Sequence, residues 1–309
     1  TNHQTALTEH LDSFELQSIK YDLRTTYLGD QLHSYSETHS KKINYSAEWL
    51  PVYQVFSNKM HTVWTRSYEY YNDAPGNKRS GKRKFYHDSR NYAWGFYNYD
   101  TRGRTTIKAK LLDGAPPPSE LIESSLEPTT VAELAALPTL SSKVTTYDYE
   151  PLATSADSHH LQDSRKAREV SEWIVQNGTT NLIARTWYVY TRSYTGGLPT
   201  LTTRTIKAAS SAAEFFDTAN AISTTIHYSG AEDYDALPEL WNLPLRAEEP
   251  DGTLRTWEYE LGEWQNQTFT SNPFGKHLRI TQRTGTTALP YGLPNISTYT
   301  VEVRNNFGD

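Results

Sequence analysis

The sequence predicts an all-β fold built from antiparallel hairpins, and three observations lead to this prediction. Tyr (22) and Trp (8) are frequent in a chain of 309 residues, whereas Met occurs once, and aromatic residues favour strands. Bulky and polar residues alternate along many short segments, as side chains do along a strand. Turn signals separate these segments, among them Arg102-Gly103, Asn177-Gly178 and Asp251-Gly252. We therefore expect antiparallel hairpin repeats that form a wound strip or shell segment, with short helical insertions.

The clearest hairpin is predicted over residues 92–110. Tyr97 and Tyr99 lie on one face of its first strand because strand side chains have a period of two. Asp100 precedes the turn, and Gly103 supplies the positive φ that a short hairpin turn usually requires. Arg104 follows the turn and opens the second strand. These five residues are expected to shape a structural turn.

A second hairpin of the same kind is predicted over residues 245–260. Pro250 presets φ for its position in the turn, Asp251 can accept a hydrogen bond through its carboxylate, and Gly252 completes the turn. Trp257 and Tyr259 repeat the aromatic pair. We expect the residues of both turns to serve stability rather than activity.

The first third of the chain is expected to form strands after an irregular start. Residues 5–14 have a weak helical spacing of Leu7, Leu11 and Phe14, which fits a helix or an irregular arm. From residue 16 onward, the sequence predicts two strands joined by a turn at residues 28–30. Short aromatic strands follow around residues 49–56 and 61–71.

Helical periods occur in two segments, which we predict as insertions at residues 117–138 and 208–222. In the first, Ser119 can cap a short helix through Leu126, and Pro128 can open a second helix that ends at Pro138. The second segment has an apolar stripe that we expect to pack on the sheet. Its members are Ala212, Phe215, Phe216, Ala219 and Ile222.

Residues 169–192 read as a long hairpin about Asn177-Gly178, the dipeptide that best fits a type I′ turn. Both faces of its second strand are apolar, with Trp187 on one and Tyr190 on the other, so we expect this strand to be covered on both sides. A last alternating strand covers residues 299–304 and runs into a turn-like ending. We expect more repeats beyond it in a parent protein.

Composition limits the chemistry that the chain can support. Cysteine is absent, so there is neither a disulfide framework nor a thiolate metal site. The net charge of −6 is spread over interleaved acidic and basic residues, which gives no global field for nucleic acid or anionic lipid. No apolar run approaches the ~20 residues that span a bilayer. Asp157-Ser158-His159-His160 lacks a further ligand at helical spacing, and we expect no metal and no cofactor.

One basic segment stands apart at residues 78–90, with Phe85 and Tyr86 inside it. Its cations could bind phosphates and its aromatic rings could stack on bases. Because the cluster is local and the whole chain is acidic, we interpret it as a solvated hairpin loop. Nucleic acid is not expected as a partner.

The amino-acid sequences of the two hairpins resemble the YD repeats of the Rhs family of bacterial proteins. The matching segments are Tyr97-Asn98-Tyr99-Asp100-Thr101-Arg102-Gly103-Arg104 and Glu249-Pro250-Asp251-Gly252-Thr253. The resemblance implies that residues 1–309 are one fragment of a long strip of hairpins that winds into a secreted or cell-surface shell. Such a shell encloses a cargo or presents an adhesive surface and is not an enzyme. Its partners would be the rest of the parent repeat chain, neighbouring copies, a glycan or an encapsulated cargo.

An alternative is a secreted β protein that binds or cleaves carbohydrate. Exposed Trp and Tyr can stack on sugar rings, and Asp251, Glu258, Glu260 and Glu263 could offer two carboxylates at the ~5 to 9.5 Å separation used by glycosidases. Carboxylates beside a repeated turn more often act as turn caps or solvated strand residues. The positions of the carboxylates distinguish an enzyme from a structural role, because an enzyme needs two carboxylates that face one cleft.

Overall fold

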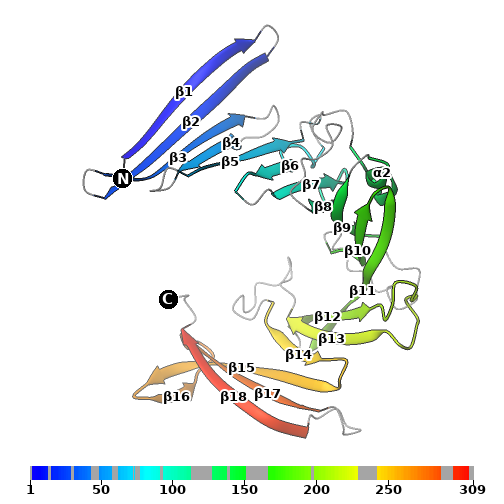
Figure 1. The fold of residues 1–309 in the computed structure, drawn as a ribbon. Coiled ribbons are helices and arrows are strands. Elements are labelled where there is room, and N and C mark those ends of the chain that lie inside the picture. The colour runs from blue at the N-terminus through cyan, green and yellow to red at the C-terminus, as the bar shows by residue number, and fades with distance from the viewer. Residues whose placement is uncertain are drawn as a thin grey trace. The chain divides into compact units, whose positions relative to one another are not determined.

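The computed structural model describes residues 2–12, 15–28, 31–42, 49–57, 62–71, 73, 77–90, 93–112, 127–137, 140–150, 166–195, 198–228, 242–286 and 295–305. Strands dominate this part of the chain, and one short α-helix occurs in it (Figure 1). The paired strands described below run antiparallel. The prediction of an all-β, antiparallel fold with little helix is therefore confirmed.

The chain divides into two compact units. The first contains residues 1–148 and 170–183, and the second contains residues 149–169 and 184–309. Strand β11 (Thr179–Thr195) contributes its first residues to the first unit and the rest to the second.

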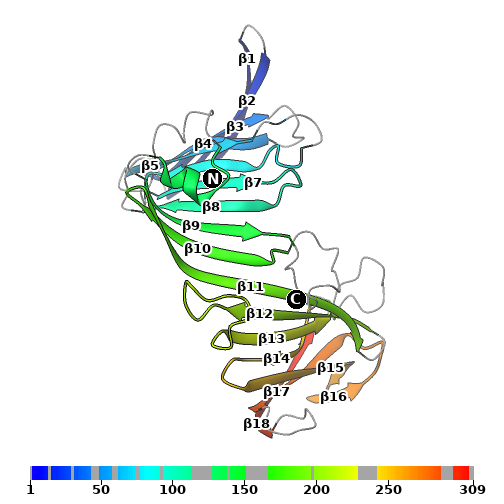
Figure 2. The ribbon, with the colours of Figure 1, turned by 90° about the vertical axis from the view of Figure 1, so that its right-hand side faces the viewer.

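Strands of the first unit pair with the strand that follows them in the sequence, as both ribbon views show (Figure 1, Figure 2). Strand β9 pairs in addition with β10. The strands are β1 (Asn2–Asp12), β2 (Glu15–Leu28), β3 (Gln31–Lys42), β4 (Trp49–Ser57), β5 (Val63–Tyr70), β6 (Arg83–Asp88), β7 (Ala93–Tyr99), β8 (Thr105–Leu111), β9 (Ser141–Asp148) and β10 (Glu169–Gln176).

The second unit continues the same arrangement. Strand β11 pairs with β12, and pairing then proceeds through β13 and β14 to β15, which pairs with β16 and β17; β17 pairs with β18. The bounds are β12 (Leu198–Lys207), β13 (Ala221–Tyr228), β14 (Pro244–Glu248), β15 (Thr253–Gln265), β16 (Thr268–Ser271), β17 (His277–Thr286) and β18 (Asn295–Asn305).

The helical or irregular start expected at residues 5–14 is wrong for the described residues, because β1 forms a regular ladder with β2 from Asn2↔Thr25 to Asp12↔Glu15. Leu7 and Leu11 are four residues apart, and an even spacing also places two residues on one face of a strand. The spacing alone could not distinguish a helix from a strand. The two strands predicted about residues 28–30 are confirmed as β2 and β3.

The first predicted insertion is confirmed in its second half as helix α2 (Val131–Ala135). Thr130 caps it: its hydroxyl accepts a hydrogen bond from the backbone N–H of Glu133, whose carboxylate in turn accepts from the backbone N–H of Thr130, a capping box. Leu134 is completely buried. The helix predicted over residues 119–126 lies outside the described residues.

Helix α2 covers one face of the sheet formed by β6 to β10 (Figure 1), and this is where the core of the first unit lies. Buried side chains on that face alternate along the strands with half-buried or exposed ones on the other, as a strand with one covered face requires. The core consists of Phe85, Phe96, Ile107, Ala109, Leu111, Leu134, Ala135, Leu137, Leu140, Val144 and Val175.

The helix predicted at residues 208–222 is wrong: residues 209–220 form successive turns, and strand β13 begins at Ala221. Asn220 holds these turns together, because its side chain accepts a hydrogen bond from the N–H of Ala209 (3.0 Å) and donates one to the carbonyl of Glu214 (2.7 Å). The N–H of Glu214 donates to the carboxylate of Asp217 (2.8 Å). Short polar side chains that bond to nearby backbone groups compete with helix formation.

One residue of the predicted apolar stripe, Phe215, does pack on the sheet. Phe215 meets Trp187 edge-on at 5.9 Å, and Trp187, Val189 and Ile206 form a buried cluster beneath it. Tyr190 on the opposite face of β11 is buried with Leu201. The prediction that β11 is covered on both faces is confirmed for residues 187–190, whereas residues 179–181 and 192–194 are exposed. Phe216 of the predicted stripe is 76% exposed.

The turn at Asn177-Gly178 between β10 and β11 has positive φ at both residues, 50° and 77°, which confirms a type I′ turn. Among the residues described, no helix is long and apolar enough to cross a membrane.

Candidate functional site

The hairpin between β7 and β8 closes through its backbone and through one carboxylate. The N–H of Gly103 donates to the carbonyl of Asp100 (2.8 Å), and the N–H of Asp100 donates to the carbonyl of Arg104 (2.9 Å). Gly103 has φ +76°. This is a type I turn followed by a left-handed residue that forms a bulge. Asp100 accepts the N–H groups of Arg102 and Arg104 at 3.0 and 2.9 Å, and the Arg104 guanidinium at 2.6 Å.

The hairpin between β14 and β15 repeats this hydrogen bonding. The N–H of Gly252 donates to the carbonyl of Glu249 (3.0 Å), and the N–H of Glu249 donates to the carbonyl of Thr253 (2.9 Å). Gly252 has φ +82°. Pro250 occupies the second turn position, and Asp251 accepts the N–H of Thr253 (2.9 Å). Glu249 is therefore the structural counterpart of Asp100, and Gly252 is the counterpart of Gly103.

The aromatic pairs do not share this equivalence. Tyr97 and Tyr99 precede their turn, whereas Trp257 and Tyr259 follow theirs. Each pair contacts its own neighbours rather than an equivalent pair in the next hairpin. The distance between ring centroids is 6.2 Å for Tyr97 and Tyr86, 5.9 Å for Tyr99 and Tyr71, and 6.2 Å for Tyr259 and Tyr228. Trp257 donates its indole N–H to Gln282 (3.2 Å), and Tyr259 donates to the carbonyl of Pro244 (2.5 Å).

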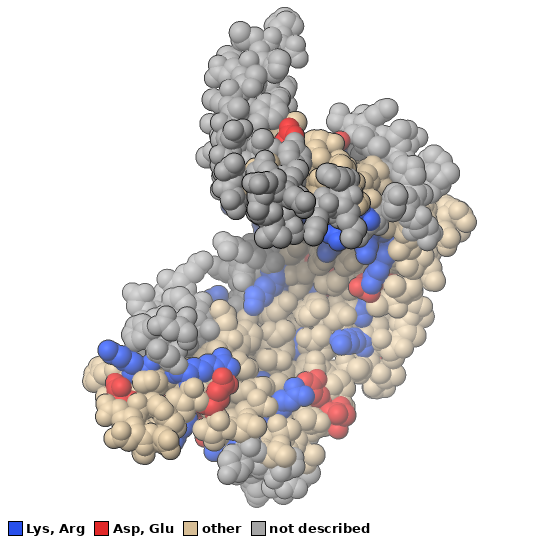
Figure 3. Space-filling model, turned by 60° about the vertical axis from the view of Figure 1, so that its left-hand side comes forward, with Lys and Arg blue, Asp and Glu red and all other residues tan. Residues whose placement is uncertain are grey.

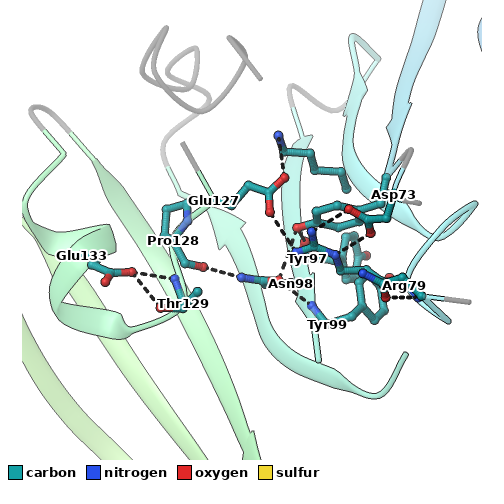
Figure 4. Close-up of polar contacts among 12 residues, drawn as sticks. Asp73, Arg79, Tyr97, Asn98, Tyr99, Glu127, Pro128, Thr129 and Glu133 are labelled. Atoms are coloured by element: carbon teal, nitrogen blue, oxygen red, sulfur yellow. Dashed lines mark hydrogen bonds and ion pairs between the residues drawn. The ribbon is translucent and has the colours of Figure 1, made fainter. Parts of the chain in front are cut away.

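A polar cluster that sequence analysis missed lies beside the first hairpin (Figure 4). Arg79 holds Asp73 with two hydrogen bonds of 2.8 Å and Glu127 with a third, also 2.8 Å. Its guanidinium carbon lies 4.2 Å from the ring centroid of Tyr71. The cluster therefore ties the turn before β6 to the chain that leads into α2. Only the basic composition of residues 78–90 hinted at it.

Asn98 forms a second link in the same region (Figure 4) and is 2% exposed. Its amide donates to the carbonyl of Pro128 (2.8 Å), and its side-chain oxygen accepts the N–H of Tyr99 (2.7 Å). Tyr71 donates to the carbonyl of Tyr97 (2.9 Å) and lies 3.4 Å from the Asn98 oxygen. Asn98 thus fixes the segment that precedes α2 against strand β7.

The interpretation of residues 78–90 as a solvated loop is wrong for their second half, which forms strand β6. Lys84 and Phe85 are buried there, and Lys84 approaches Glu127 at 3.9 Å. A β-bulge in β6 explains this, because the register shifts between Glu69↔Phe85 and Tyr70↔Arg83, so that Lys84 and Phe85 oppose one residue of β5.

Electrostatics in the region follow these contacts. The hydrogen bonds from Arg79 hold the pKa of Asp73 below its usual value. Burial raises the pKa of Tyr71, and the nearby Glu127 carboxylate raises it further. Burial also raises the pKa of Tyr70, to about 12. These tyrosines are therefore neutral hydrogen-bond donors at neutral pH.

The turn carboxylate Asp100 gives a testable pH dependence. Burial alone would raise its pKa, but the hydrogen bonds from Arg104 and Arg102 outweigh burial, so that its pKa lies below its usual value. A carboxylate with a lowered folded-state pKa adds stability above its unfolded pKa of about 3.9, and that stability is lost as the pH falls through the folded pKa. We expect the melting temperature of Asp100→Asn to fall less steeply between pH 5 and pH 3 than that of the unmodified chain. Parallel curves would mean that Asp100 adds no pH-dependent stability.

The four carboxylates considered for a glycosidase each have a different partner. Glu258 pairs with Arg283 and Glu260 with Arg279 across β15 and β17. Glu263 lies 3.8 Å from His277, and Asp251 caps its turn. Glu258 and Glu260 lie two residues apart on β15 and therefore share a face, but each is paired with an arginine of β17. The four carboxylates line strand and turn positions.

The described ranges contain no group of three or more His, Asp or Glu side chains able to hold a metal ion. The His159-His160 segment lies outside those ranges.

Comparisons with known proteins add no functional information. No model of a known family matches the sequence, and no curated protein matches it. Among solved structures, a porin-like protein from Bacteroides uniformis ATCC 8492 aligns over 97% of this chain and 95% of its own, with 12% identity and a TM-score of 0.29. A similarity of that size defines neither a shared fold nor a shared function.

Proposed function

We propose that the chain is a non-catalytic, structural section of a secreted or cell-surface YD-repeat shell that encloses a cargo or presents an adhesive surface. The observation that carries the proposal is the repeated hairpin turn. Asp100 to Arg104 and Glu249 to Thr253 make the same two backbone hydrogen bonds and have a glycine of positive φ at the same position. One turn geometry used in both units fits a protein built by adding hairpins.

The pairing of strands supports the same proposal. Within each unit the strands pair mainly with sequence neighbours, so an added hairpin changes only the pairing next to it. The charged groups of β15 and β17 form ion pairs across the strands. Such pairs suit a solvated sheet surface more than a reaction centre.

Self-association provides the test. A sheet section of a larger shell presents backbone groups that seek another strand, so we expect the isolated chain to form concentration-dependent dimers or larger species in sedimentation velocity experiments. The competing carbohydrate function is tested on the same preparation with glycan arrays and a panel of polysaccharides. A chain that stays monomeric at all concentrations would overturn the proposal. Binding or cleavage of a glycan that is lost in Glu258→Gln or Glu260→Gln would favour the carbohydrate function instead.

A further inference from the structure

The face of the first unit opposite its core presents a set of lysines and arginines. On β8, Ile107 and Ala109 are buried while Lys108 and Lys110 are exposed. The register places Lys110 opposite Gly95 and Lys108 opposite Tyr97, and Gly95 lies opposite Tyr86. The bulge at Lys84 turns Arg83 toward this same face, where its guanidinium lies 5.2 Å from the Tyr68 ring and 5.8 Å from the Tyr86 ring. We call Arg83, Arg90, Lys108 and Lys110 the basic face.

Aromatic rings hold the arginines of the basic face in place. Arg83 lies over two tyrosine rings, and Arg90 lies 4.9 Å from the ring of Trp64. The Tyr86 ring itself lies against Gly95, where an added Cβ would come within 2.0 Å of a ring carbon. A guanidinium held on a ring loses less side-chain freedom when it binds an anion, because its orientation is already restricted.

The charges of the basic face are not neutralised by the described part of the chain. Arg66 pairs with Asp88 (2.8 Å) and Lys143 pairs with Glu172 (2.9 Å) on the same side of the sheet. The four residues of the basic face form no such ion pair with another described residue. Lys110 also lies directly opposite Lys143, and like charges at opposed positions destabilise a sheet. This excess of positive charge stands in a chain whose net charge is −6.

The chemistry of the basic face favours a flexible chain of carboxylates over nucleic acid. Four rings on this side, Phe56, Trp64, Tyr68 and Tyr86, already carry an arginine, so bases would have to displace it to stack. Exposed Lys and Arg side chains occur as separate groups on the face drawn in Figure 3, with Asp and Glu also present.

We propose that the basic face binds an acidic polypeptide segment through Arg83, Arg90, Lys108 and Lys110. Guanidinium and ammonium groups pair with carboxylates through charge-assisted hydrogen bonds. The biological role, recognition of an acidic stretch in a cargo or partner of the shell, rests on the proposed function. The binding itself is a property of the basic face.

The test uses fluorescently labelled poly-L-glutamate and the full chain in an anisotropy titration at low and at physiological salt. We expect saturable binding that weakens as salt rises, and a loss of affinity of about tenfold or more in the triple variant Arg83→Gln, Lys108→Gln, Lys110→Gln. The matched control is Arg204→Gln, Lys207→Gln, Lys276→Gln, which removes three exposed charges from the second unit and is expected to bind nearly as the unmodified chain does.

Three results would overturn the inference. The first is no binding of poly-L-glutamate at low salt, and the second is an equal loss of affinity for poly-L-glutamate in both triple variants. The third is tighter binding of a labelled oligothymidylate than of poly-L-glutamate, which would assign the basic face to nucleic acid. Circular dichroism verifies that both variants fold. Sedimentation of the same samples distinguishes the failure of this inference from the failure of the proposed function. Self-association without binding of poly-L-glutamate would reject the basic-face inference alone. Binding of poly-L-glutamate by a chain that stays monomeric would reject only the proposed shell function.

Discussion

Replacing Asn98 with Leu is expected to lower the free energy of unfolding of the first unit by about 2–4 kcal/mol. Leu has the same branched arrangement of side-chain heavy atoms but no polar atoms, so the carbonyl of Pro128 and the N–H of Tyr99 each lose a partner. An unpaired buried polar group costs about 1–3 kcal/mol. The segment that carries α2 would lose its hydrogen bond to the sheet.

Urea denaturation followed by tryptophan fluorescence measures this effect. Asn181→Leu is the matched control, because Asn181 is an exposed residue of β11 in the same unit, and exposed substitutions usually stay within about 0.5 kcal/mol. If Asn98→Leu changed stability no more than Asn181→Leu, the link between β7 and the Pro128 segment would have no energetic weight.

Replacing Gly103 with Val is expected to cost about 2–4 kcal/mol, more than the ~1–3 kcal/mol of a β-branched residue at positive φ alone. A Cβ on Gly103 would come within 2.5 Å of the carbonyl oxygen of Lys78, which is backbone and cannot simply turn aside. Gly252→Val is expected to have the same backbone strain from a β-branched residue at positive φ, since Gly252 has φ +82°.

Thermal and chemical denaturation of three variants separates the two causes. Gly103→Asn tolerates positive φ but still adds a Cβ, so its cost reports the contact with Lys78. Gly252→Val reports the cost at the equivalent turn. Melting temperatures unchanged in both valine variants would show that these glycines are ordinary linker residues and would remove the conformational basis of the repeated turn.

Local signals in the sequence predicted local structure well. The turns at Gly103, Asn177-Gly178 and Gly252 use positive φ, a backbone conformation that few residues other than Gly and Asn adopt easily, and each turn is found where it was predicted. The helix at residues 208–222 failed because an apolar spacing of three and four arose in a segment whose Ser, Asp and Asn side chains bond to the backbone instead.

The clusters around Arg79 and Asn98 could not be predicted because their partners lie far away in the sequence. Glu127 is 48 residues from Arg79, and Pro128 is 30 residues from Asn98. The local sequence around an arginine or asparagine does not indicate which distant carboxylate or carbonyl it will contact. The basic face was hidden for a related reason, since a bulge at Lys84 reverses the face that simple alternation would give to Arg83.

Pairing between strands that are adjacent in the sequence has a consequence for how the chain is made. A strand that pairs with its predecessor closes only a short loop, and the entropy of loop closure rises with loop length. Contacts that are near in sequence also form faster than distant ones. Each hairpin can therefore form soon after its second strand leaves the ribosome or a translocation channel, with the preceding strand as its template. Synthesis or export from the N-terminus would then extend the sheet one strand at a time, without waiting for residues still to come.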